Sequence, residues 1–274
     1  MALYAETRGT GHPVICLPPF AADRSMMIAA LEPAFVGSAN WQRTYVDLPG
    51  CGRSPAGPEH SDGVVDAVLD LIDRRYGDRG CLLAGWSYGG YLAAALARRQ
   101  PWRFGGLLLI CPGVRAAPAD RTLPPAPTDP GPDGWLRRVP AHLVDQIVGA
   151  VGNRRPEVAE RVAAALAAME PTDTAYLDRL RSGGFRLSDE GSAVGYPGPV
   201  CLVTGRDDRV AGHADQYAAL AGYPAATFVA MAGAGHYLPF EQPVAFRGLV
   251  SQWLARCSSG LGVAAPAPGR RWPA

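Results

Sequence analysis

Short runs of apolar residues recur along the chain, and longer stretches with helical periodicity lie between them. Six such runs fall at residues 14–17, 41–50, 81–85, 106–113, 199–205 and 226–233. Runs that hardly alternate with polar residues are typical of parallel strands covered on both faces. Helical patterns fall at residues 25–31, 61–76, 88–99 and 214–221. This alternation predicts an α/β fold, with an open, mostly parallel central sheet, right-handed crossovers and helices on both faces.

One long stretch interrupts the alternation. Residues 113–199 contain no strong strand pattern; a proline-rich segment is followed by helical patterns at 135–151, 156–170 and 173–181. The chain is therefore predicted to comprise a first part of the core, a helical cap or lid, a second part of the core and a disordered tail, at residues 1–112, 113–199, 200–257 and 258–274.

The composition is that of an ordinary globular protein, with 48% hydrophobic and 19% charged residues in 274. The formal net charge of +1 gives no reason to expect nucleic acid or an anionic membrane as a partner. The chain has no lysine, which excludes a Schiff-base lysine and a Ser-Lys dyad. Six cysteines without a CxxC motif, no signal-peptide pattern and no bilayer-length apolar run predict a reduced, cytoplasmic protein.

A serine stands between two glycines directly after the third apolar run. The segment GWSYGG places Ser87 between Gly85 and Gly89, and a helical pattern follows at once. A tight turn alone accounts for glycine and serine at such a place. The preceding strand and following helix instead favour a sharp, strained turn that exposes the hydroxyl beside the free N–H groups of a helix N-terminus. Ser87 is therefore the candidate nucleophile.

A serine hydroxyl is a poor nucleophile until a base takes its proton. Among the five histidines, His236 follows the last predicted strand across the short segment AGAG, so a loop can carry its ring to the edge of the sheet. The other histidines precede a strand, lie in a polar loop, lie on a cap helix or precede a helix, and are predicted to be structural: His12, His60, His142 and His213.

Four segments, in chain order, resemble those of the α/β-hydrolase family. DLPGCGRS (47–54) is similar to the loop after the family's fourth strand, and GWSYGG (85–90) to its nucleophile elbow. GRDDRV (205–210) resembles the turn that bears the acid, and GAGHYLPFEQP (233–243) the histidine loop. The resemblance covers nearly all of the chain before the tail. Within the family it is nearest to pimeloyl-carrier-protein methyl esterases and related carboxylesterases.

The resemblance implies roles for further residues. Asp207 and Asp208 compete as the carboxylate that orients the histidine, and the family pattern G-x-x-D-x-V implies Asp208, with Asp207 stabilising the turn. The oxyanion hole is implied to use the N–H of Tyr88 and one from the loop after the first buried strand. That loop usually reads His-Gly-x but here reads Pro18-Pro19-Phe20, and because proline has no N–H, Phe20 is the expected donor.

Aromatic residues are candidates for the substrate pocket. Trp86 flanks the nucleophile and is interpreted either as a wall of an acyl pocket or as a core residue. Trp135, Tyr176 and Phe185 of the insertion are expected to line or close a lid that excludes water from the serine.

Together these residues predict a serine hydrolase that cleaves an ester or thioester of a small-molecule or carrier-bound acyl substrate. No cofactor is expected, and no HExxH motif or paired Cys/His spacing indicates a metal. Acyl transfer, cyclisation of a polyketide-like chain and carbon–carbon bond hydrolysis are alternatives on the same fold. A binding module that reuses the pocket is the alternative without catalysis.

Overall fold

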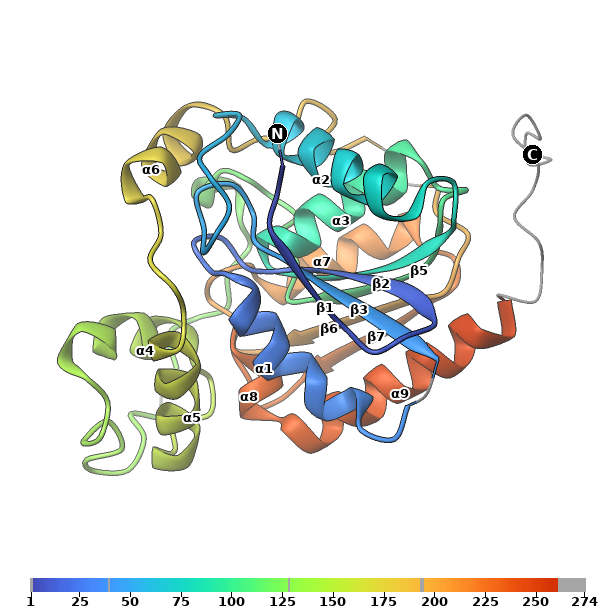
Figure 1. The fold of residues 1–274 in the computed structure, drawn as a ribbon. Coiled ribbons are helices and arrows are strands. Elements are labelled where there is room, and N and C mark those ends of the chain that lie inside the picture. Colours follow the sequence, from blue (N-terminus) through green and yellow to red (C-terminus); the bar gives the residue numbers. More distant parts are fainter. Residues whose placement is uncertain (1, 39, 128, 193–194, 261–274) are drawn as a thin grey trace.

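A mixed sheet forms the centre of the molecule (Figure 1). The computed structural model describes residues 2–38, 40–127, 129–192 and 195–260. Within these residues the sheet has seven strands in the order β1-β3-β2-β4-β5-β6-β7. All neighbouring pairs are parallel except β1 and β3. The strands are β1 Ala5–Arg8, β2 His12–Leu17, β3 Trp41–Val46, β4 Cys81–Trp86, β5 Phe104–Ile110, β6 Val200–Gly205 and β7 Ala226–Met231.

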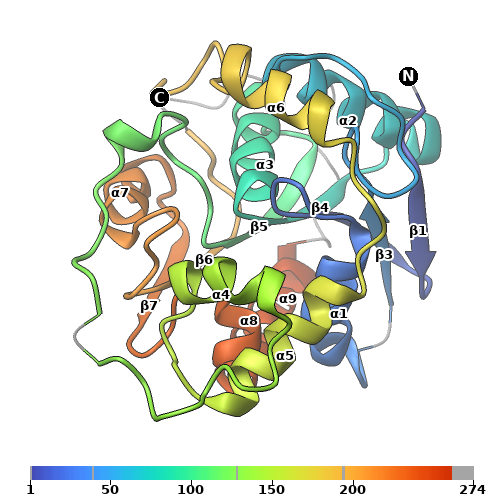
Figure 2. The same cartoon turned by 90° about the vertical axis from the view of Figure 1, so that its left-hand side faces the viewer.

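Helices cover both faces of the sheet (Figures 1 and 2). On one face α1 packs beside α9, and on the other α2 packs beside α3. The predicted fold class is therefore confirmed. The helices are α1 Arg24–Phe35, α2 Ser61–Tyr76, α3 Tyr88–Arg99, α4 Val144–Ala150, α5 Pro156–Ala167, α6 Thr174–Gly183, α7 His213–Ala218, α8 Leu238–Glu241 and α9 Pro243–Gly260.

The central strand β4 shows why its run of apolar residues is nearly continuous. Every residue of β4 is buried, and successive side chains enter different hydrophobic clusters. Leu82 and Trp86 belong to the cluster beneath α1 and α9, whereas Leu83 belongs to the cluster with α2 and α3. A strand covered on both faces has no exposed side on which polar residues would be favoured.

The strand β1 is not among the predicted strands. Its sequence, AETR, lacks an apolar run because β1 is a partly exposed strand at the edge of the sheet. It pairs antiparallel with β3, from Ala5 opposite Val46 to Arg8 opposite Arg43. Pairing with an existing strand, and not hydrophobic patterning, defines this element.

The segment between β5 and β6 contains α4, α5 and α6 (Figure 2). The helical pattern predicted at 135–151 is shorter in the structure, where a 3₁₀ turn at Ala141–Leu143 precedes α4. Glu170 is one of the residues that join the segment to the core: its backbone N–H donates to Asp23 at 2.7 Å, and its carboxylate pairs with Arg24 at 2.7 Å.

The C-terminal helix α9 is not among the predicted helices. α9 extends to Gly260, so residues 258–260 are helical and do not belong to a tail. The rest of the predicted tail, 261–274, lies outside the described residues. No helix in the described part of the chain is both long and apolar enough to span a bilayer.

Candidate active site

Ser87 occupies the sharp turn between β4 and α3. Its backbone has φ 55° and ψ −115°, a conformation that a residue with a side chain rarely adopts. Hydrogen bonds on both sides hold this conformation: the Ser87 N–H donates to Ile110 at 2.9 Å, and the Ser87 carbonyl accepts from Tyr91 and Gly113 at 3.0 Å each. The strained turn therefore depends on α3 and on the end of β5.

Two glycines allow this turn to form. A Cβ on Gly89 would lie 2.1 Å from the carbonyl oxygen of Leu17 in β2, and a Cβ on Gly85 would lie 2.3 Å from the carbonyl oxygen of Gly89. Both distances are far shorter than any ordinary contact, and both involve backbone atoms that cannot rotate away. The glycines of GWSYGG thus let β2, β4 and α3 approach one another.

His236 and Asp208 meet below the sheet edge. Nδ1 of His236 lies 3.0 Å from Oδ2 of Asp208, and both side chains are buried. The other Asp208 oxygen accepts from the backbone N–H groups of Val210 and Ala211, at 2.8 and 2.9 Å. Burial alone would raise the pKa of Asp208, but the charge and hydrogen bond of His236 and these N–H groups together lower it. An ionised Asp208 only accepts, so Nδ1 of His236 donates and Nε2 is left as the basic atom.

The other candidate carboxylate has a different place. Asp207 uses its backbone N–H to donate to the carbonyl of Ala234 at 2.9 Å, which ties the acid turn to the histidine loop. The structure thus brings Asp208, and not Asp207, against the His236 ring.

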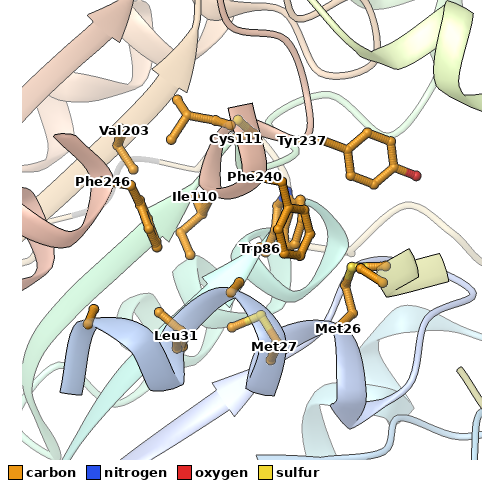
Figure 3. Close-up of a cluster of buried hydrophobic side chains, with 14 of the residues drawn as sticks. Met26, Met27, Leu31, Trp86, Ile110, Cys111, Val203, Tyr237, Phe240 and Phe246 are labelled. Carbon is orange, nitrogen blue, oxygen red and sulfur yellow. The ribbon is translucent and has the colours of Figure 1, made fainter. Parts of the chain in front are cut away.

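Trp86, the residue before Ser87, contacts the histidine loop. Its indole N–H donates to the His236 carbonyl at 3.0 Å, and its ring packs edge-on against Tyr237 with centroids 5.9 Å apart. Figure 3 shows Trp86 beside Phe240 and above Met26 and Met27 of α1. Trp86 is fully buried and lies in the core, not on the wall of a cavity.

Glu241, which the sequence analysis did not single out, joins the histidine loop to the insertion. Its carboxylate accepts from the backbone N–H groups of Gly235, Gly152 and Asn153 at 2.7–2.9 Å. Burial raises the pKa of Glu241 to about 7. In the sequence, the feature that could have pointed to Glu241 is its place inside the segment GAGHYLPFEQP, only five positions after the histidine.

A cavity of about 570 Å³ opens beside Ser87. Ser87, Phe20, Tyr88 and Phe185 line it, together with residues of segments 113–121 and 181–186. The rings of Tyr88 and Phe185 stack with centroids 4.8 Å apart, and Phe20 meets Phe185 edge-on at 5.1 Å. Residues of the insertion therefore form part of the cavity wall.

The two other aromatic residues predicted for the pocket lie elsewhere. Tyr176 is fully buried, and its hydroxyl donates to the carbonyl of Pro58 at 2.7 Å. Trp135 is buried in the hydrophobic cluster that includes α5. Neither residue lines the cavity beside Ser87.

The N–H groups proposed for the oxyanion hole come from both sides of the cavity. Tyr88 begins α3, so no carbonyl of the helix pairs with its N–H. Phe20 follows the two prolines and precedes Ala21, which has a positive φ of 59°. In the described part of the chain neither N–H donates to a protein acceptor.

A third buried group lies beside the histidine–aspartate pair. One ligand-capable atom each of Cys111, Asp208 and His236 falls within 4.8 Å of the others. Metal binding by cysteine requires a thiolate. Burial, the main cause, and the nearby Asp208 raise the pKa of the Cys111 thiol well above its usual value, and the thiol lies 3.7 Å from the Gly235 carbonyl, to which it donates. Cys111 fits a protonated core residue and not a metal ligand.

A strained serine after a central parallel strand, with a buried histidine–carboxylate pair carried by later loops, is the arrangement of hydrolases with a nucleophile elbow. The model of the alpha/beta hydrolase family matches residues 14–249. The chain therefore belongs to the alpha/beta hydrolase family, and the resemblance seen in its motifs is confirmed.

Known relatives share parts of the chain. A pimeloyl-[acyl-carrier protein] methyl ester esterase from Shewanella woodyi is 28% identical over 109 residues, 40% of this chain and 39% of the esterase. The chain thus matches about two-fifths of the length of that curated relative. The polyketide synthase ThaQ from Burkholderia thailandensis is 31% identical over 221 residues, 75% of this chain but 10% of the synthase.

The fold is shared over almost the whole chain with a solved structure. An alpha/beta superfamily hydrolase from Oenococcus oeni superposes with a TM-score of 0.80 and 24% sequence identity, covering 94% of this chain and 100% of the other. The protein is thus an esterase-like alpha/beta hydrolase.

Proposed function

We propose that the protein is a serine hydrolase that cleaves a carboxylic ester or thioester, with Ser87 as nucleophile, His236 as base and Asp208 as the orienting acid. The observation that carries this proposal is the buried His236–Asp208 pair, held at 3.0 Å by a loop that is itself bonded to Trp86, the neighbour of Ser87. The order Ser87, Asp208, His236 along the chain agrees with the order of this fold.

In the first half of the reaction, Nε2 of His236 takes the Ser87 proton as Oγ attacks the carbonyl carbon of the substrate. The negative oxygen of the tetrahedral intermediate accepts from the N–H groups of Phe20 and Tyr88. Each such donor contributes about 3 kcal/mol to stabilising the transition state. The intermediate then collapses, the bond to the alcohol or thiol breaks, and His236 returns its proton to the leaving group.

In the second half, water replaces the leaving group. His236 takes a proton from water as the oxygen attacks the acyl-serine, and the second tetrahedral intermediate releases the carboxylic acid and restores the Ser87 hydroxyl. Asp208 stabilises the imidazolium in both halves and keeps its own charge.

The insertion, 113–199, is proposed to act as a cap that shields the cavity from water. Support comes from its residues on the cavity wall and from the bond between the His236 N–H and the Ala150 carbonyl at 2.7 Å. The cavity volume suits a small-molecule acyl group or the acyl end of a carrier-bound substrate. All six cysteines are buried and unpaired, which supports an origin in the reducing cytoplasm.

A fluorophosphonate label tests the nucleophile directly. We expect one adduct on Ser87 by mass spectrometry, turnover of p-nitrophenyl and acyl-thioester substrates, and loss of both in Ser87→Ala. Ser182→Ala is the matched control, because Ser182 lines the same cavity but donates to the Asp178 carbonyl of its own helix. Full turnover by Ser87→Ala refutes the serine mechanism.

A second candidate is acyl transfer or cyclisation of a polyketide-like chain. The similarity to the polyketide synthase ThaQ over 75% of this chain favours it. Hydrolysis and acyl transfer proceed through the same acyl-serine. They differ in the group that attacks it, which is water in hydrolysis and an alcohol in transfer or cyclisation. In H₂¹⁸O, hydrolysis places one solvent oxygen in the acid, whereas transfer or cyclisation gives a product without it.

A further inference from the structure

The cavity beside Ser87 is lined by an unusual number of positive charges. Among the lining residues that the structure describes, none is an aspartate or glutamate and four are arginines: Arg115, Arg121, Arg181 and Arg186. Arginine is also the only basic side chain with a permanent charge at any ordinary pH. In a chain with a formal net charge of only +1, this concentration is specific to the cavity.

Arg121 is held in place by neutral groups. Its guanidinium donates to the carbonyl oxygens of Arg115, Val210 and Ala116, at 3.0, 2.9 and 2.8 Å. These bonds fix the orientation of the side chain but leave its charge uncompensated. Burial and the positive charge of Arg181 lower the pKa of Arg121, which is the sign of a cation lacking a sufficient counter-charge.

Arg181 places a second charge on the cavity wall, against the ring of Phe20. Its guanidinium carbon lies 4.5 Å from the centre of the Phe20 ring, and Phe20 is the residue whose N–H is proposed to bind the oxyanion. Among the residues that the structure describes, no carboxylate lies within ion-pair distance of Arg115, Arg121 or Arg181.

A carboxylate next to the cavity already has partners of its own. Glu190 is almost fully buried and pairs with Arg186 at 3.3 Å. Its other oxygen accepts from the Tyr91 hydroxyl and from the Ala116 N–H. Arg186 is therefore compensated, and three guanidinium groups remain for a ligand.

We propose that the substrate carries an oxyanion, a carboxylate or a phosphate, on the part that occupies this cavity, and that Arg121, Arg181 and Arg115 bind it. This inference rests on the proposed hydrolysis at Ser87 and narrows its substrate class to anionic esters or thioesters. Guanidinium groups bind both oxyanions through paired hydrogen bonds, and the attraction is strongest where the cavity excludes water.

Two substrate pairs distinguish the carboxylate from the phosphate. The first is monomethyl adipate against its ω-amide, which has the same shape without the charge. The second is hexanoyl-phosphopantetheine against hexanoyl-pantetheine. At low ionic strength we expect kcat/KM about tenfold or more higher for the charged member of at least one pair, and a smaller ratio at high salt. Ratios near one in both pairs overturn the proposal.

Substitutions test whether the cavity arginines cause the preference for the charged substrate. Arg115 and Arg181 are exposed, so Arg115→Gln, Arg181→Gln and the double variant are expected to fold, and the double variant to reduce the charged-to-neutral ratio about tenfold. Arg138→Gln is the matched control, because Arg138 lies outside the cavity and its side chain is 78% exposed. A ratio that survives in the double variant and in Arg121→Gln overturns the assignment.

Binding to Ser87→Ala separates this inference from the proposed function. By calorimetry, Ser87→Ala is expected to bind adipate or phosphopantetheine more tightly than the neutral counterpart, and the arginine variants to remove the difference. Arginine-dependent anion binding without turnover of any ester by the wild type refutes only the hydrolase mechanism. Turnover of neutral esters without any anion preference refutes only the anion site.

Discussion

The buried carboxylate of Asp208 accepts the Nδ1 hydrogen of His236 at 3.0 Å. This contact sets the tautomer of the ring and leaves Nε2 free of a proton. Asp208→Asn keeps the size of the side chain but lets its amide donate to Nδ1, so the wrong nitrogen carries the proton. We expect kcat to fall by about 10³–10⁴-fold, measured with a p-nitrophenyl ester.

The neighbouring carboxylate provides the control. Asp207 contacts the histidine loop through its backbone N–H, which Asp207→Asn preserves. We expect kcat within about threefold of the wild type, since surface changes away from the reacting groups have small effects. A larger loss in Asp207→Asn than in Asp208→Asn would exchange the roles of the two residues.

The Ser87 turn is predicted to tolerate no side chain at Gly89. A Cβ there would lie 2.1 Å from the Leu17 carbonyl oxygen, so Gly89→Ala forces β2 and α3 apart. We expect a loss of about 3 kcal/mol or more in the free energy of unfolding, measured with urea. Gly149 lies in α4 with no atom within 4 Å of its Cβ position, and Gly149→Ala is expected to be neutral or to stabilise by up to about 1 kcal/mol. Equal effects would contradict the steric account.

Glu241 predicts a particular dependence of stability on pH. Its pKa is about 7 in the folded protein, above the ordinary value of 4.5. Between these values the folded state binds more protons than the unfolded state, so this group's contribution is complete below pH 4.5 and is lost as the pH rises through 7. Glu241→Gln removes the titration. The stability of the wild type relative to this variant is therefore expected to be greater at pH 5 than at pH 8, by urea unfolding, and a difference independent of pH would contradict the prediction.

A buried ion pair anchors the loop that resembles the one after the fourth strand of the family. Asp47 is fully buried and accepts from Arg24 through both its backbone N–H and its guanidinium, at 2.8 and 2.9 Å. Asp47→Ala removes the buried partner of Arg24, which keeps only the partly exposed carboxylates of Glu6 and Glu170, and we expect a loss of about 3 kcal/mol in the free energy of unfolding.

An exposed pair on the insertion gives the comparison. Arg138 and Glu160 are 3.4 Å apart, with side chains 78% and 38% exposed. Glu160→Gln is expected to cost less than about 1 kcal/mol because solvent screens the pair. Similar losses in the two variants would show that burial is not what makes the Asp47 contact strong.

Local chemistry explains why so much of the site could be predicted. In GWSYGG the glycines stand where strand and helix meet, because a Cβ on Gly85 or Gly89 would collide with backbone atoms. In the same way, the aspartate follows the buried strand β6 and the histidine follows the half-buried strand β7, and the apolar run of each strand is visible in the sequence. Since parallel strands end at one edge of the sheet, their following loops converge there.

The pocket was predicted less well because it depends on contacts between distant segments. Phe185 lines the cavity, whereas Tyr176 turns its hydroxyl to Pro58 and Trp86 packs in the core against α1. Nothing in the local sequence distinguishes an aromatic side chain that lines the cavity from one that packs in the core, because both are largely apolar.

The amino-acid sequence by itself determined the class of fold, and it pointed to Ser87, Asp208 and His236 as candidates in that order, since each follows from short-range patterning and backbone sterics. Only the tertiary structure decided the charge of the cavity and the part played by Glu241. Arg121 and Arg181 are sixty residues apart along the chain and line one cavity through the folding of the insertion, and Glu241 accepts hydrogen bonds from Gly152 and Asn153 of that insertion. Electrostatic contacts act through space, so their partners are known only when the chain has folded.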